Sequence, residues 1–557
     1  MNRPVARALV CGVVAASVAA VLDGQGRGAV EWTTSGFDAQ RSAWIRNDPR
    51  ISVEAMRKPG AFGAFKFLWK LKLEHDPNAA TTLTEPILLD RLIGFRGFKS
   101  IAFVATASET VHAIDVDFGT PLWKYHVNYS ASPPPLLAGT PACPGGLSAA
   151  LSRPTTVAPF AFAAGGGGRE GRSGGGVGEP GRGATTIPAA GRGRGGAPPP
   201  AVPPAPSPAV VPGSAAAAAN LAPGGLPGGA RQGGPGGAGV PFVPGADAAY
   251  VVGSDGYLHA LNVSNGWDNM TPALFLPANT RAMGLIIASG ASGAATAYAV
   301  TTHGCGSQPD AVWAMDLASP KKTVVAFKAG GATIAGTSGV ALGRDGTVYA
   351  ATTDGPTAMS NAVFALEPAT LRPKASFAVA KADFQSSPLL FQWKGRDALI
   401  VAGRTELVVF DAASLQAGPV AGASFGAPIS ESAGALASWV DAEDTRWIAV
   451  ATARAIQTFR VVEQNGQLAL LPAWTSRAIT SPLPPFVVNG VLFAASAGTR
   501  SAPAVLYAIE AASGKDLWNS GRAIATAARG GLSAGGGNVY LPGADSTLYA
   551  FGFEIEK

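Results

Sequence analysis

The hydrophobic residues of this chain occur in short runs that alternate with polar residues and end at Gly, Pro, Ser or Asn clusters. Such alternation is typical of half-buried β-strands, and long amphipathic stretches with a helical period are missing. One strand–turn–strand pattern appears near both ends of the chain, at Ala113, Asp115, Gly119 and Trp123 and again at Ala508, Glu510, Gly514 and Trp518. The acid and the glycine are expected to shape a turn, and the tryptophan to anchor the strand that follows it.

Weaker copies of this pattern fill the sequence between and beyond these two. They centre on Ala260, Ala314, Ala365, Val409, Phe459 and Ala550. From Ala260 onward the copies recur at intervals of about 42–54 residues, a period that indicates a β-propeller with several short strands per repeat. The pattern therefore predicts an all-β fold, an eight-bladed β-propeller. The blade around Phe459 is the least regular, because Val461 replaces the turn acid.

The two ends of the chain are predicted to meet in one blade. The last repeat ends without the fourth strand that the tryptophan introduces elsewhere. Near the other end, the segment Phe67 to Leu73 contains Trp69 and has no blade of its own. We expect it to pair as the outer strand of the last blade, which would leave no open sheet edge in the ring. The propeller then comprises residues 65–164, with the closing strand and first blade, and residues 246–557.

A tract of different composition separates these two parts. Residues 165–245 are rich in Gly, Pro and Ala, and carry six arginines against two glutamates. Such a segment buries too little apolar surface to offset its ordering entropy, so we expect a disordered insert on the bottom face of the propeller. It holds most of the formal net charge of +6. The propeller body has no basic patch with interleaved aromatics, so no nucleic-acid partner is expected.

The first residues have the pattern of a secretory leader. Arg3 and Arg7 precede an apolar run from Ala8 to Leu22, which is short for a membrane span. Residues 1–22 are therefore interpreted as a signal peptide and residues 23–64 as an N-terminal leader segment of the mature chain. We expect a periplasmic or secreted protein, monomeric and without a transmembrane segment.

Several repeats resemble those of the PQQ-binding-like, or quinoprotein alcohol dehydrogenase-like, β-propeller family. The resemblance rests on SSPLLFQWKGRDALIVAG (386–403), TSPLPPFVVNGVLFAAS (480–496) and GSDGYLHALN (253–262). The segment from Trp32 to Ser52 also looks like the leader of quinoprotein alcohol dehydrogenases. The resemblance implies the propeller fold, but the family contains both dehydrogenases and scaffold proteins of the cell envelope, so it leaves the activity open.

The chemistry of the dehydrogenases sets clear requirements. The resemblance implies PQQ with Ca²⁺, a carboxylate base, an aromatic ring stacked on the quinone, and a disulfide between adjacent cysteines. This chain has no adjacent cysteines and no cluster of Asp, Glu and Asn in the loops of the top face. We therefore expect a binding or scaffold module of the cell envelope, with no metal or cofactor. The alternative is a PQQ-dependent dehydrogenase that uses PQQ and Ca²⁺ to oxidise an alcohol or a sugar.

The family geometry places a candidate site at the mouth of the central channel. The residues that precede each inner strand are expected at its rim: Arg281, Thr337, Gln385, Ser386, Glu431, Thr480 and Arg529. Two arginines beside one glutamate favour a small anionic or zwitterionic ligand, while the alternative is that these charges pair or hydrate. The other expected partners are envelope proteins.

The remaining cysteines and histidines carry simpler expectations. Beyond the leader the only cysteines are Cys143 and Cys305, which map to the same face of neighbouring blades. In an oxidising compartment we expect a disulfide between them, the alternative being two separate buried thiols. His112 and His259 occupy the same repeat position, which favours a structural role in a strand.

Overall fold

The computed structural model describes residues 31–60, 63–75, 82–94, 97–127, 143, 146–157, 247–289 and 295–554. The expected signal peptide and the expected disordered insert lie outside these residues. Within the described part, no helix is long and apolar enough to cross a membrane. Its helical elements are α2 (Val53–Arg57) and the 3₁₀ turns η1 (Cys305–Ser307) and η2 (Ala412–Ala417).

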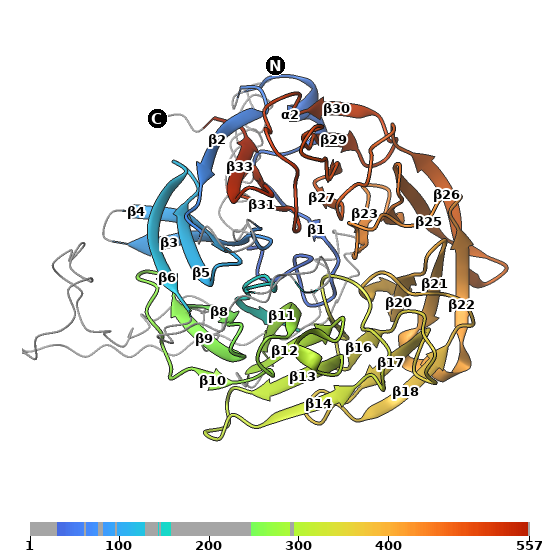
Figure 1. Cartoon of the computed structure of the whole chain (residues 1–557). Coiled ribbons are helices and arrows are strands. Elements are labelled where there is room, and N and C mark those ends of the chain that lie inside the picture. The colour runs from blue at the N-terminus through green and yellow to red at the C-terminus, as the bar shows by residue number, and fades with distance from the viewer. Residues whose placement is uncertain are drawn as a thin grey trace, which may run out of the picture. The chain divides into compact units, whose positions relative to one another are not determined.

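The chain forms eight sheets arranged as blades around a central channel (Figure 1), which confirms the predicted eight-bladed β-propeller. Blade 1 consists of β3 (Ile87–Gly94), β4 (Gly97–Ala105), β5 (Thr110–Asp115) and β6 (Thr120–His126). Blade 2 consists of β8 (Ala248–Val252), β9 (Tyr257–Asn262) and β10 (Ala273–Leu274). Blade 3 consists of β11 (Arg281–Ser289), β12 (Ala295–Thr302), β13 (Ala311–Asp316) and β14 (Val324–Lys328). Blade 4 consists of β15 (Ala341–Leu342), β16 (Val348–Ala351), β17 (Ala362–Leu366) and β18 (Pro373–Ala378).

The second half of the ring repeats the same antiparallel order from the channel outward. Blade 5 consists of β19 (Leu389–Trp393), β20 (Arg396–Ala402), β21 (Glu406–Asp411) and β22 (Pro419–Ser424). Blade 6 consists of β23 (Ala437–Val440), β24 (Arg446–Ala451), β25 (Ile456–Gln464) and β26 (Gln467–Thr475). Blade 7 consists of β27 (Phe486–Val488), β28 (Val491–Ala495), β29 (Leu506–Glu510) and β30 (Asp516–Asn519). Blade 8 consists of β31 (Ser533–Gly535), β32 (Asn538–Pro542), β33 (Thr547–Gly552) and β2 (Lys66–Lys72).

Blade 8 confirms the predicted closure of the ring. Strand β2 pairs antiparallel with β33, with Phe67 opposite Phe551 and Leu71 opposite Leu548. The outer strand of this blade thus comes from the N-terminal part of the chain and its other three strands from the C-terminal part. Leu73 adds a backbone hydrogen bond to Ser546 just beyond the strand. The closure covers the outer edge of β33.

The repeated glycine and tryptophan join neighbouring blades. Trp69, Trp123 and Trp474 each lie over a turn glycine of the next blade, at Gly119, Gly266 and Gly514. Each indole also donates a 3.0 Å hydrogen bond to a backbone carbonyl in that turn, at Val116, Val263 and Ala511. A Cβ on any of these glycines would lie 2.5–2.7 Å from the indole, and their φ angles are positive. Glycine is therefore required both by the turn and by the close approach of the ring.

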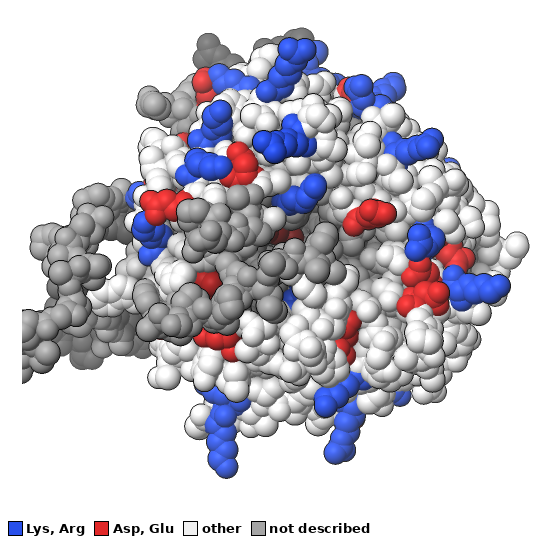
Figure 2. All heavy atoms as spheres, in the orientation of Figure 1, with Lys and Arg blue, Asp and Glu red and all other residues white. Residues whose placement is uncertain are grey.

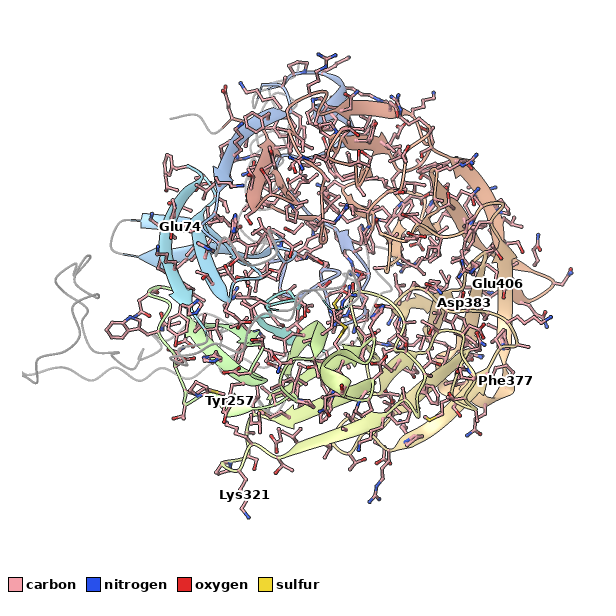
Figure 3. All side chains as sticks on the ribbon, in the orientation of Figure 1. Glu74, Tyr257, Lys321, Phe377, Asp383 and Glu406 are labelled. Atoms are coloured by element: carbon pink, nitrogen blue, oxygen red, sulfur yellow. A yellow bond between two sulfur atoms is a disulfide. The ribbon has the colours of Figure 1, made fainter. Side chains whose placement is uncertain are left out.

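Two further blade junctions are also packed by an aromatic side chain. Phe377, labelled at the outer edge of the ring in Figure 3, lies over Gly418 of blade 5. Trp518 of blade 7 packs edge-on against Phe65 and Phe551 at blade 8, with ring centroids 4.9 and 5.7 Å away. The aromatic side chain at the end of the sequence pattern thus stabilises the contact between blades as well as the strand that carries it.

Blade 2 differs from the expected four-stranded unit. The sequence predicts its inner strand near Gly146 to Val157, but only Ser152 bridges to β8, at Tyr250. The chain then leaves this blade, and β7 (Pro154–Thr156) pairs in parallel with β11 of blade 3. Proline lacks an N–H and favours edge positions, so Pro154 is better accommodated at this edge than inside a blade.

His112 lies in β5 with 4% of its surface exposed, as expected for a strand residue with a structural role. Burial lowers the pKa of His112 to about 4, although Glu74 partly opposes this shift. The unfolded chain binds a proton at this histidine near a pH of about 6.5, whereas the folded chain does not until a pH of about 4. Folding is therefore linked to the loss of a proton across this pH window.

We expect the free energy of unfolding to fall as the pH decreases from 7 to 4, with His112 contributing up to about 3 kcal/mol of the loss. The variant His112→Gln cannot bind this proton and should show a flatter dependence over the same window. Urea unfolding at a series of pH values measures both slopes. Parallel curves for the two proteins would contradict this assignment.

Candidate functional site in the central channel

The N-terminal leader lies inside the channel and contacts the blades in their order around the ring. We call residues Trp32 to Asp48 the channel segment. Within it, β1 (Trp44–Ile45) pairs in parallel with β27 of blade 7. Hydrogen bonds connect the segment successively to blade 1 and to blades 3 to 8, at Leu88, Leu285, Leu342, Leu390, Ser438, Val487 and Gly537. A further one joins Thr33 to Arg153, which lies between the bridge to blade 2 and β7. The segment therefore fixes the inner edges of seven blades.

Arg41 is the main polar anchor of the channel segment. Its side chain is 1% exposed and donates hydrogen bonds to the carbonyls of Val340 (2.8 Å), Ser35 (2.6 Å) and Gly284 (3.1 Å). A further bond of 2.9 Å reaches the hydroxyl of Thr34. Burial lowers the pKa of Arg41 to about 10, so the guanidinium stays charged at neutral pH. Backbone carbonyls of blades 3 and 4 thus hold a cation at the centre of the ring.

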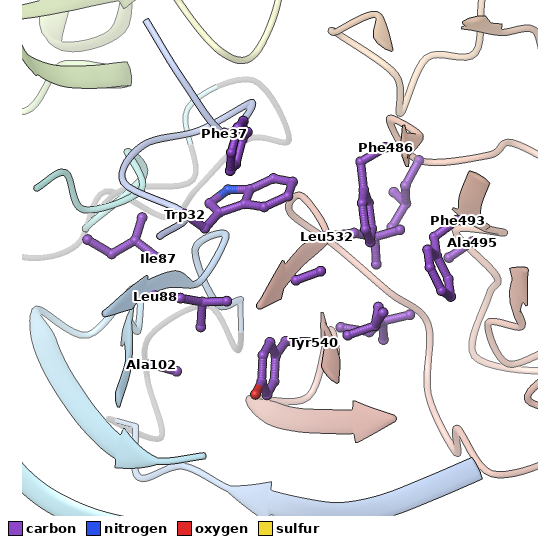
Figure 4. Packing of buried hydrophobic residues seen from close by; sticks show 14 of the residues in the cluster. Trp32, Phe37, Ile87, Leu88, Ala102, Phe486, Phe493, Ala495, Leu532 and Tyr540 are labelled. Atoms are coloured by element: carbon purple, nitrogen blue, oxygen red, sulfur yellow. The ribbon is translucent and has the colours of Figure 1, made fainter. Parts of the chain in front are cut away.

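Aromatic side chains pack the other end of the channel segment. Trp32 lies between Phe37 and Phe486 (Figure 4), with ring centroids 5.4 Å apart in both pairs. Both contacts are edge-on, an arrangement that aromatic quadrupoles favour. Phe486 belongs to blade 7, so this cluster joins the segment to the ring.

A cavity of about 400 Å³ lies in the channel against this segment. Trp32, Ser35, Gly36 and Ala43 form its floor, and residues that precede the inner strands of the blades form its walls. The apolar part of the wall includes Leu83, Leu147, Leu436, Phe486 and Leu532. The polar part includes Glu85, Ser148, Arg281, Thr337, Ser338, Ser432 and Arg529. The cavity has the size and mixed lining of a site for a small ligand.

Glu85 is the one carboxylate among the described lining residues of this cavity. Its oxygens accept hydrogen bonds from the Trp32 indole (2.9 Å), the Ser35 hydroxyl (2.7 Å) and the Gly36 amide (3.2 Å). Burial raises the pKa of Glu85, and these hydrogen bonds oppose that shift. Glu85 therefore links the channel segment to blade 1 through these three hydrogen bonds.

The structure brings three of the predicted rim residues together at this cavity. Arg281 of blade 3, Thr337 before blade 4 and Arg529 before blade 8 line it. Burial lowers the pKa of Arg281, whereas Arg529 is exposed and donates a hydrogen bond to the Ala528 carbonyl. In the described part of the chain, no carboxylate forms an ion pair with Arg529 within 4.0 Å.

The other predicted rim residues do not line the cavity. The Gln385 amide donates to Asp383 (2.6 Å), which is labelled in Figure 3, and Ser386 is fully buried, where its hydroxyl accepts from the Ala402 amide (2.8 Å). Glu431 and Thr480 are exposed on the surface outside it. Ser386 thus serves local backbone bonding.

The predicted disulfide between Cys143 and Cys305 is present, across 162 residues of sequence. Cys305 follows directly on the loop that leaves β12, and Thr302 at the end of β12 pairs with Arg281. The disulfide therefore lies beside the basic side of the cavity mouth and links blade 3 to the segment that precedes blade 2.

Sequence reasoning missed Glu85, Ser148 and the floor of the cavity. Glu85 precedes Pro86 just as Ser387 precedes Pro388, so aligning the first blade with the later repeats would have placed Glu85 at the channel. The floor residues fall in the leader, which has no repeat to align. Nothing in the sequence distinguishes them as lining residues.

Away from the cavity, charges are mixed over the visible face of the propeller. Figure 2 shows basic and acidic side chains interspersed rather than gathered into one large patch. Several of them are paired, as in Arg404 with Asp383 and Arg477 with Asp516. The described residues seen on this face form no extended basic surface of the kind that binds a phosphate backbone.

Comparison with known proteins shows the fold. No family model matches the sequence, and no curated protein matches it. Among solved structures, quinohemoprotein alcohol dehydrogenase from Comamonas testosteroni aligns with a TM-score of 0.51 and 12% identity, covering 96% of this chain and 82% of that one. A europium-containing methanol dehydrogenase aligns with a TM-score of 0.53 and 10% identity, covering 95% and 99%. BamB from Moraxella catarrhalis gives a TM-score of 0.44, 12% identity and coverage of 89% and 99%.

The described residues of the cavity do not fit PQQ with Ca²⁺. Calcium prefers six to eight oxygen ligands, which are usually supplied by several carboxylate and amide side chains together. Here Glu85 is the single carboxylate of the described lining, and three donors already occupy its oxygens. Elsewhere in the described ranges, no group of three or more His, Cys, Asp or Glu is placed to hold a metal ion. Moreover, Cys143 and Cys305 join separate segments rather than adjacent positions.

Proposed function

We propose that this propeller, whose fold is that of the quinoprotein alcohol dehydrogenases, is an exported binding module that holds a small anionic ligand in its channel cavity. The observation that carries the proposal is the charge of the lining: Arg281 and Arg529 border the cavity, while Glu85 is bonded to the channel segment. A guanidinium binds carboxylate or phosphate through paired N–H donors, which suits a ligand of this charge. The leader-like residues 1–22 support a place in the periplasm or outside the cell.

The channel segment supports a binding role rather than a moving catalytic part. Its hydrogen bonds to seven of the blades hold the cavity floor in one position. A preformed, rigid cavity reduces the entropy that ligand binding costs. We therefore expect ligand binding to cause no large conformational change. This favours a role in recognition or sequestration of the ligand, and we propose envelope proteins as further partners.

We expect the double variant Arg281→Ala/Arg529→Ala to lose at least about tenfold in affinity, because each charge-assisted hydrogen bond contributes roughly 1.5–3 kcal/mol. A thermal-shift screen of mono- and dicarboxylates, phosphate and amino acids identifies the ligand, and calorimetry measures its affinity for each protein. The matched control is Arg372→Ala/Arg460→Ala, which removes the same charge at two exposed positions. Equal affinities for the two double variants would overturn the channel site.

The second candidate is a PQQ-dependent dehydrogenase acting on an alcohol or a sugar, which the shared fold favours. PQQ would supply the two-electron oxidation, and the protein would bind and orient the substrate. Incubation with PQQ and Ca²⁺, followed by a dye-linked assay with alcohols and sugars, separates the two functions. We expect no substrate-dependent dye reduction, and sustained turnover would establish the dehydrogenase instead.

A further inference from the structure

A second cavity, of about 510 Å³, lies between blades 5 and 6, far along the ring from Arg529 and the blade 8 side of the channel. We call it the blade 5–6 groove. Two tight turns form its rims: Lys394–Gly395, between β19 and β20, and Asn465–Gly466, between β25 and β26. All four residues have positive φ angles, as two-residue hairpin turns that follow the strand twist require. The walls of the groove are therefore short, rigid hairpins.

An aromatic ring lies in the wall of this groove. Trp393 packs on the apolar core shared by blades 5 and 6 and remains partly exposed toward the groove. Leu468 of blade 6 and Val420 of blade 5 continue the apolar surface, and Val420 is 43% exposed. The groove thus offers a small apolar surface beside open solvent, with the Lys394 ammonium 6.0 Å from the centre of the Trp393 ring.

Polar side chains project from the same face of blade 5 as this tryptophan. Trp393 lies directly opposite Arg396, and Ala398 lies directly opposite Asp411. Because Arg396 and Ala398 are two residues apart on one strand, Trp393, Arg396 and Asp411 share one face. Arg396 and Asp411 approach to 3.6 Å, and the small side chain of Ala398 between them leaves space. Gln467 adds an exposed amide from blade 6.

The charges of the groove balance. Lys394 pairs with Glu463 at 2.5 Å and Arg396 with Asp411 at 3.6 Å, while Asp397 pairs with Arg344 of blade 4 at 2.8 Å. A charged ligand would therefore meet no net opposite charge, whereas a neutral ligand with many hydroxyl groups would find donors and acceptors of both kinds. Such a ligand also needs an apolar face to lie on Trp393.

From this combination we propose that the blade 5–6 groove binds a neutral oligosaccharide. A sugar ring stacks its C–H face on Trp393, and its hydroxyls bond to Arg396, Asp411 and Gln467. The site is independent of the channel cavity, because none of its lining residues lines that cavity. It gives the protein a way to associate with a polysaccharide while the channel stays free.

Calorimetry with maltohexaose, cellohexaose and chitohexaose, and with hexagalacturonate as a charged comparison, tests this proposal. We expect at least one neutral hexasaccharide to bind and Trp393→Ala to lower its affinity at least about tenfold. The matched control is Trp267→Ala, which removes a tryptophan that is 73% exposed outside the groove.

Two further variants separate binding from folding. Arg396 has an 80% exposed side chain and Gln467 is exposed, so Arg396→Ala and Gln467→Ala should fold normally and bind the sugar more weakly. The variant Arg281→Ala/Arg529→Ala should bind it as the wild type does, which distinguishes this site from the channel. The proposal is overturned if no neutral hexasaccharide binds, if only hexagalacturonate binds, or if Trp267→Ala weakens binding as much as Trp393→Ala.

Discussion

A chain that begins at Leu73 is expected to lose cooperative unfolding and to associate through blade 8. This truncation removes β2, which covers the outer edge of β33, and it also removes the channel segment. An uncovered strand edge is a template for pairing with other chains. Calorimetry and size-exclusion chromatography measure the two effects. The control deletion of residues 23–28, which lie before the channel segment, should leave both measurements nearly unchanged.

The single substitution Trp69→Ala isolates the closure from the loss of the channel segment. Trp69 lies over Gly119 and donates to the Val116 carbonyl, so it joins blade 8 to blade 1. We expect the free energy of unfolding to fall by about 3 kcal/mol, in the range seen when a large aromatic residue is truncated at a packed site. Trp267→Ala serves as the control, with a change within about 0.5 kcal/mol. Equal losses for the two variants would contradict the closure model.

The blades could be predicted because their signal is local. A turn that needs glycine at a positive φ and an aromatic residue at fixed spacing leaves the same residues in two repeats, at Gly119 and Gly514, and weaker traces in the others. The closing strand could be predicted from the number of strands in each repeat. The last repeat lacks an outer strand, and the segment Phe67 to Leu73 is a strand that belongs to no other blade. The disulfide followed from the two cysteines available and the face to which both map.

The route of the channel segment could not be predicted in the same way. Many of its contacts with successive blades join backbone N–H and C=O groups, as between Leu342 and Ala39 or Leu390 and Gln40. Such bonds depend little on side-chain identity, so they leave no periodic pattern in the sequence. The inner strand of blade 2 was misplaced for a related reason, because β7 gains its partner from blade 3 through backbone pairing.

The candidate site shows the same division. Arg281 and Arg529 were found because they stand at an aligned position at or just before the start of an inner strand. Gln385 and Ser386 stand at comparable positions but turn to Asp383 and to the Ala402 amide. Position in the repeat predicts which residues are near the channel, whereas the hydrogen bond that each side chain forms decides whether it faces the cavity.

Arg41→Ala is expected to lower the free energy of unfolding by about 3–5 kcal/mol, the range for removing a buried charged partner from its hydrogen bonds. The substitution leaves the carbonyls of Val340, Ser35 and Gly284 without this donor. It also removes a positive charge that opposes the rise in the pKa of the Asp38 carboxyl caused by burial. Arginine and alanine at position 41 must both adopt a φ of 62°, so backbone strain contributes little to the difference in stability. Urea unfolding measures the change.

Two further variants test whether the loss of stability comes from the hydrogen bonds of the Arg41 guanidinium. Arg41→Lys keeps the charge but cannot reach four acceptors in the geometry of a guanidinium, so most of the loss should remain. Lys58→Ala removes an exposed cation beyond the channel segment and should change the stability by less than about 0.5 kcal/mol. Because Ser35 and Gly36 form part of the cavity floor, Arg41→Ala should also lower the affinity for the channel ligand. Its affinity for the oligosaccharide in the blade 5–6 groove should be unchanged. A stable Arg41→Ala protein with full ligand affinity would show that the blades hold the channel segment without this residue.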